Sequence, residues 1–136
     1  MSRTRIIAAA AAALAIGVGG AVAGGTGSAA AAEVYPVDNG RTTIVYLTHA
    51  ETVTAAQVGA GNVINALLGN DRWAVTLEQG SRYEHSWYYR PDKGRVWSNV
   101  TGQQVVAEAA AHPTGRVALG ITPSVPAHPL WVQQVW

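Results

Sequence analysis

The sequence predicts an α+β fold, in which an antiparallel sheet of about four to six strands is covered by one long and one short helix. Segments rich in β-branched and aromatic residues recur between turn signals, as is typical of strands. Two other segments begin with the capping pattern of a helix. Strands that follow one another along the chain favour antiparallel pairing with helices on one face. The predicted folded part, residues 33–136, has the length of a single small domain.

The segment before this domain, residues 1–32, is predicted to be a cleavable Sec-type signal peptide. Arg3 and Arg5 precede an uncharged apolar run, small residues follow, and no acidic residue occurs before Glu33. Cleavage is expected after Ala23 or, preferably, after one of residues 30–32. An uncleaved membrane anchor is the alternative, because the apolar run approaches the roughly 17–25 residues of a span. The prediction is therefore a secreted or cell-envelope protein with no stable membrane span after cleavage.

The first elements of the domain are a strand and a long helix. Residues 42–48 are β-branched and aromatic, which favours a strand. Thr48 and Glu51 form a capping-box pattern, and apolar residues then recur on one helical face as far as Leu68. Gly59 and Gly61 weaken this helix by roughly 1 kcal/mol each, so a bend or a division is expected there.

Three strands are predicted next, over residues 72–79, 82–90 and 95–100. The Gly80-Ser81 pair resembles a two-residue hairpin loop, and residues 91–94 form a strong turn signal. These connections predict a meander of three antiparallel strands.

A second, shorter helix and the last strands complete the chain. Thr101 and Gln104 form another capping-box pattern, and the helix is expected to end at His112-Pro113. Residues 116–121 read as a strand, and residues 130–136 as a last strand or an extended tail. The sequence leaves open whether Trp131 and Trp136 dock on the domain or are exposed.

Composition excludes several classes of function. The chain has no cysteine, so neither disulfides nor thiolate chemistry is available. From Glu33 onward, seven basic residues face eight acidic ones, which argues against binding nucleic acid or anionic lipid. Arginine, alanine and glycine are abundant, as is typical of an exported protein of a high-GC bacterium.

The densest group of candidate binding residues lies in residues 82–90. Alternate residues of a strand share a face. One face would carry Tyr83, His85, Trp87 and Tyr89; the other would carry Arg82, Glu84, Ser86, Tyr88 and Arg90. Aromatic rings with a polar edge stack on sugars or on protein partners, so the first face is the candidate binding surface. In the alternative interpretation this face is core, and the charged face becomes the interaction surface.

Catalytic patterns are scarce. No serine lies in a G-x-S-x-G motif, no zinc-binding histidine pair occurs, and no cofactor or metal is predicted. A small hydrolase using His85 or His49, and an enzyme inhibitor presenting residues 91–94, are the alternatives. The sequence favours a non-catalytic binding module for a protein, a glycan or another envelope component.

Overall fold

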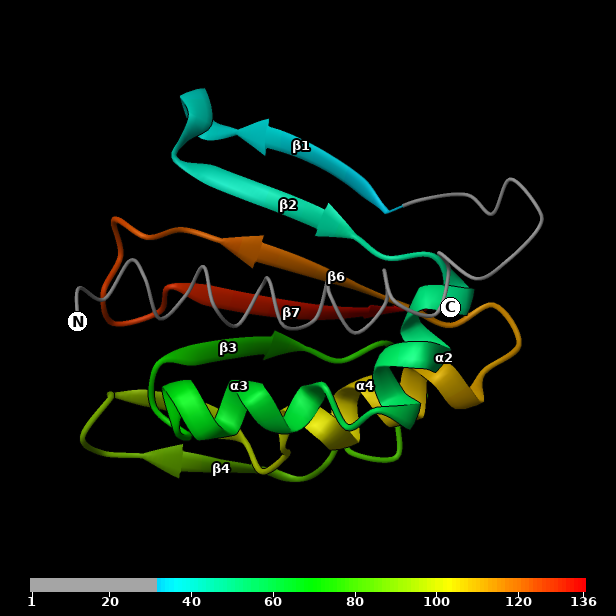
Figure 1. Ribbon diagram of the computed structural model, residues 1–136. Helices are drawn as coiled ribbons and strands as arrows, with labels where there is room; N and C mark the ends of the chain where they lie inside the picture. The colour runs from blue at the N-terminus through cyan, green and yellow to red at the C-terminus, as the bar shows by residue number, and fades with distance from the viewer. Residues whose placement is uncertain (1–31) are drawn as a thin grey trace.

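The computed structural model describes residues 32–136, so the predicted signal segment lies outside the described residues except for Ala32. The described part is an α+β domain with a five-stranded sheet, a separate two-stranded hairpin and three α-helices (Figure 1). In chain order the elements are β1 (Glu33–Val37), a 3-10 turn η1 (Asp38–Gly40), β2 (Thr42–Tyr46), α2 (His49–Gln57), α3 (Gly61–Leu68), β3 (Trp73–Thr76), β4 (Trp87–Arg90), β5 (Arg95–Ser98), α4 (Gly102–Ala111), β6 (Arg116–Ile121) and β7 (Leu130–Val135). The α+β class predicted from the sequence is confirmed.

The sheet is mixed rather than purely antiparallel. Its strand order is β1-β2-β6-β7-β3, and β3 runs parallel to β7 while the other neighbours are antiparallel. Figure 1 shows the strands in this order, with the hairpin beyond the β3 edge. The predicted meander of three strands is therefore wrong, because β3 pairs with the last strand of the chain instead of with β4.

The buried carboxylate of Glu108 in α4 explains this difference. It accepts hydrogen bonds from the Ser81 hydroxyl at 2.6 Å and from the backbone N–H of Arg82 at 2.7 Å. These bonds hold the chain after β3 against the helix, where it makes turns over residues 82–85. The expected two-residue hairpin loop does not form, and β4 begins only at Trp87.

The predicted long helix divides at its two glycines into α2 and α3. Gly59 adopts a left-handed φ of +70°, and a Cβ on Gly61 would lie 2.5 Å from the Cα of Gln103 in α4. The Gln103 side chain replaces the helical bonds lost there, since it donates to Ala56 O and accepts from Gly61 N.

Both predicted capping boxes form at their helices. Thr48 and Glu51 exchange side-chain and backbone hydrogen bonds at the start of α2. Thr101 and Gln104 do the same at the start of α4. These caps are local in sequence, which is why the pattern of residues locates them.

The core lies between the three helices and one face of the sheet. Leu119 in the middle of the sheet is opposite Val45 on one side and Val132 on the other. The same core cluster contains fully buried aliphatic residues of the helices, the strands and the connection after β2, among them Leu47, Ile64, Val105, Val106, Val117 and Leu130. Within residues 32–136, no helix has both the length and the apolar character needed to cross a bilayer.

The two C-terminal tryptophans dock on the domain. The Trp136 ring stacks on His112 with a centroid distance of 3.8 Å. Trp131 lies over Gly120, where a Cβ would come within 2.9 Å of its ring, and its indole N–H donates to Thr76. The end of the chain is therefore an integral strand of the sheet rather than an extended tail.

Candidate functional site

The hairpin of β4 and β5 carries the most exposed aromatic residues of the described chain. A four-residue turn joins the strands, and the backbone N–H groups of Lys93 and Gly94 donate to Arg90 O. Trp87 pairs with Ser98, and the register continues to the end of both strands. Alternation then gives this two-stranded ribbon two faces with different residues.

The outer face of the hairpin forms an apolar surface, the hairpin patch, defined as Trp87, Tyr89 and Val96. Tyr89 and Val96 are directly paired across the strands, and Trp87 is two residues from Tyr89 on the same face. The two rings are each 59% exposed and Val96 is 54% exposed. Burial of such side chains is normally favourable, so this exposed group of three is a candidate interaction surface.

The structure separates the four residues predicted to share this face. Trp87 and Tyr89 lie together in β4, whereas Tyr83 and His85 lie in the preceding turns, outside any strand. Tyr83 is half-buried against the core, and His85 is exposed. The strand is shorter than predicted because the bonds to Glu108 fix the chain before it.

The residues predicted for the alternative face also divide. Arg82 and Glu84 belong to the turns, where both side chains are exposed. Tyr88 and Arg90 lie on the inner face of the hairpin, which turns toward the domain and pairs Tyr88 with Trp97. Of the residues predicted for this face, only Tyr88 and Arg90 take part in the site.

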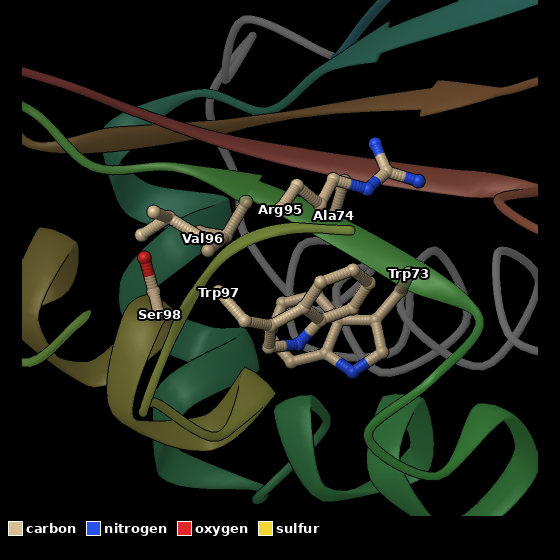
Figure 2. A pocket seen from close by; sticks show the side chains of 7 residues that line it. Trp73, Ala74, Arg95, Val96, Trp97 and Ser98 are labelled. Atoms are coloured by element: carbon tan, nitrogen blue, oxygen red, sulfur yellow. The ribbon is translucent and has the colours of Figure 1, made fainter. Parts of the chain in front are cut away.

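A cleft separates the hairpin from the edge of the main sheet. It is a pocket of about 210 Å³, and we call it the Trp97 cleft; its lining residues are Trp73, Ala74, Val75, Arg95, Val96, Trp97 and Ser98. Figure 2 shows the indoles of Trp73 and Trp97 and the extended Arg95 side chain around the cleft. Since β3 pairs only with β7 and β5 only with β4, the cleft lies between two strand edges.

A smaller pocket of about 70 Å³ lies beside the cleft, lined by Tyr88 and again by Trp73 and Trp97. Trp73 is fixed in place: it is 4% exposed, and its indole N–H donates to Gly69 O at 2.9 Å. Trp97 therefore lines both pockets, and its ring lies 5.6 Å from that of His128.

Arg90 attaches the inner face of the hairpin to the domain. Its guanidinium donates two bonds to the carboxylate of Asp92 in the turn and one, at 2.6 Å, to Asp71 before β3. The hydrogen bond from Arg90 lowers the pKa of Asp92, and both carboxylates raise the pKa of Arg90. Two carboxylates thus face the single positive charge of Arg90.

Arg95 has a different environment. Its guanidinium lies over the Trp97 ring at 5.6 Å and contacts Nε2 of His128. Burial lowers the pKa of His128, and the positive charges of Arg95 and Lys93 lower it further. His128 is therefore neutral at pH 7 and accepts a hydrogen bond from Arg95 without balancing its charge.

Among residues 32–136, the histidines proposed for a hydrolase have no acidic hydrogen-bond partner. His49 Nδ1 bonds to Gly115 O at 2.7 Å, while the Glu51 carboxylate accepts hydrogen bonds from the backbone N–H groups of Thr48 and Ala32. His85 makes no side-chain hydrogen bond within the described part of the chain. No group of three His, Asp or Glu side chains that could hold a metal ion occurs among residues 32–136. These contacts give the hydrolase alternative no support.

The sequence interpretation missed Trp97, Trp73, Arg95 and His128 as parts of a site. One signal was present: a four-residue turn at residues 91–94 places Tyr88 opposite Trp97 by simple register counting. The sequence contains no comparable signal that Trp73 and His128 lie near Trp97, because their positions depend on the pairing of β3 with β7.

Comparison with known proteins provides no relative from which a role could be transferred to these residues. No protein-family model, no curated protein and no solved structure matches this chain.

Proposed function

We propose that this chain is a secreted, non-catalytic binding module that holds a polysaccharide on the hairpin patch. The observation that carries the proposal is the pair of large side chains, Trp87 and Tyr89, each exposed over more than half of its surface on one face of the hairpin. Secretion is supported by the predicted signal segment at residues 1–32.

The chemistry of the patch favours sugar rings. A pyranose has an apolar face of C–H groups and a polar rim, and it stacks well on aromatic rings that also have a polar edge. Strand geometry places the bases of Trp87 and Tyr89 about 7 Å apart along β4. Two such platforms in line suit neighbouring units of a polymer better than one isolated small molecule.

The size of the patch disfavours a protein as the partner. Three side chains of this kind expose on the order of 300 Å², whereas a specific protein interface uses about 800 Å² on each side. A glycan chain needs a smaller contact area at each sugar unit, because its affinity is the combined effect of several stacked units.

Retention of the purified chain on insoluble polysaccharides tests the proposal directly. The panel contains cellulose, chitin and cross-linked polygalacturonate, and retention is measured from the protein left in solution. We expect Trp87→Ala and Tyr89→Ala each to weaken retention about tenfold, since each removes one stacking platform.

The matched control is Tyr35→Ala, which removes a 44% exposed tyrosine from β1, at the opposite edge of the sheet. It should bind like the unaltered chain. Absence of retention on every polymer, or equal retention of Trp87→Ala and the unaltered chain, would refute the proposal.

A further inference from the structure

The Trp97 cleft continues the hairpin patch. Val96 belongs to both, because it is exposed on the outer face of the hairpin and also lines the cleft. Residues from both hairpin faces reach the cleft, since it runs along the free edge of β5. A chain lying on Trp87 and Tyr89 therefore has a recess beside it.

The charges of the hairpin are unevenly balanced. Of its three cations, Arg90 is paired with Asp71 and Asp92. For Lys93 and Arg95, the described residues provide no carboxylate within 4.0 Å. The positive charge of Lys93 nevertheless acts on Asp92, whose pKa it lowers. Two carboxylates thus face Arg90 and Lys93, and Arg95 at the rim of the cleft is the hairpin cation that the described residues leave without a counter-charge.

Arg95 is also held in position. The Trp97 ring lies under its guanidinium, and His128 accepts one hydrogen bond from it. A guanidinium has five N–H donors, so others stay available at the rim of the cleft. A fixed arginine with free donors recognises carboxylate and phosphate groups through paired hydrogen bonds.

We infer that the polysaccharide bound by this chain is acidic, and that Arg95, at the rim of the Trp97 cleft, pairs with its anionic groups. The inference rests on the proposed function, since the sugar rings are held by the hairpin patch. The anionic group is a carboxylate, as in a uronic acid, or a phosphodiester.

The test compares polygalacturonate with its fully methyl-esterified form, which has the same backbone without the charge. Affinities are measured by titration at low ionic strength, where charge pairing is least screened. We expect the acid form to bind at least tenfold more tightly than the ester. Arg95→Gln should remove this difference and leave binding of the ester unchanged.

Two further variants serve as controls for the role of Arg95. Arg41→Gln removes the same charge from an exposed site next to η1 and should change nothing. Arg95→Lys keeps the charge but loses the paired donors, and it should retain only part of the preference for the acid form. Titration of the same variants with poly(glycerol phosphate) shows whether phosphodiesters are bound in place of carboxylates.

The outcomes separate the inference from the proposed function. If Trp87→Ala weakens binding but the acid and ester forms bind equally, or Arg95→Gln keeps the preference, the inference is overturned and the binding module stands. If Arg95→Gln abolishes a preference that Trp87→Ala does not affect, the anion site stands and the hairpin patch is not the platform. Failure of every polymer to bind overturns both.

Discussion

At the scale of single residues, Glu108 joins three segments of the fold through one buried carboxylate. It is 7% exposed, and its carboxylate accepts bonds from Ser81, Arg82 and Gln134. Burial alone would raise its pKa, but the hydrogen bonds prevail and the pKa is lowered. One helix residue thereby fixes the chain that leads into the hairpin.

We expect Glu108 to make the domain sensitive to acid. The folded state lowers the pKa of this carboxyl below the usual value of about 4.3, so its stabilisation is complete above that pH. It is lost as the pH falls through the folded pKa. Urea unfolding at pH 7 should show Glu108→Ala to be less stable by about 3 kcal/mol, because three donors lose their acceptor.

The same titration provides the control for this prediction. Between pH 5 and 3 the variant should lose less stability than the unaltered chain, since it lacks the titrating group. Glu33→Ala, at an exposed carboxylate of β1, should stay within about 0.5 kcal/mol of the unaltered chain. Parallel pH profiles for Glu108→Ala and the unaltered chain would show that another group is responsible.

At the scale of elements, the features encoded by neighbouring residues were predicted correctly, whereas the pairing of strands distant in the sequence was not. Thr48 and Thr101 mark the starts of α2 and α4, and the glycines mark the division of the long helix, because each signal lies within one turn of its effect. The parallel pairing of Trp73 with Leu130 joins segments far apart in the sequence. No local pattern encodes such a choice, and the Trp97 cleft, which depends on it, was missed for the same reason.

Close contact between α3 and α4 gives a prediction about the division of the long helix. A Cβ on Gly61 meets backbone atoms of Gln103 and Gly102 at 2.5–2.6 Å, so the helices must separate to admit it. We expect Gly61→Ala to lower the free energy of unfolding by about 2–3 kcal/mol.

Gly40→Ala is the matched control for this variant. Gly40 has a φ of +82° but open space around its Cβ position, so only backbone strain of about 1 kcal/mol is added. Urea titrations of both variants measure the difference. Equal losses would mean that helix contact does not limit this site.

At the scale of the whole molecule, the hairpin is the least integrated part of the described fold. It forms its own sheet of four-residue strands, whereas β6 lies between β2 and β7 with Val117 and Leu119 fully buried. A two-stranded ribbon is marginally stable alone and depends on its attachments. Here these include the ring contact of Trp97 with His128 and the ion pair of Arg90 with Asp71.

Hydrogen exchange should reveal this difference in stability. We expect the amides of β4 and β5 to exchange through local opening, faster than those of β6 by at least tenfold at neutral pH. Trp97→Ala should accelerate exchange in the hairpin and leave β6 nearly unchanged. Equal protection of the two regions would show that the hairpin unfolds only with the whole domain.

The place of β7 in the sheet also constrains the order in which the sheet assembles. Along the chain β7 follows all the other described strands, yet it lies between β6 and β3 and is the only described strand that pairs with β3. The sheet therefore cannot close before β7 has joined it. Until then one edge of β6 and one edge of β3 stay unpaired, and such edges can pair with other chains and start aggregation.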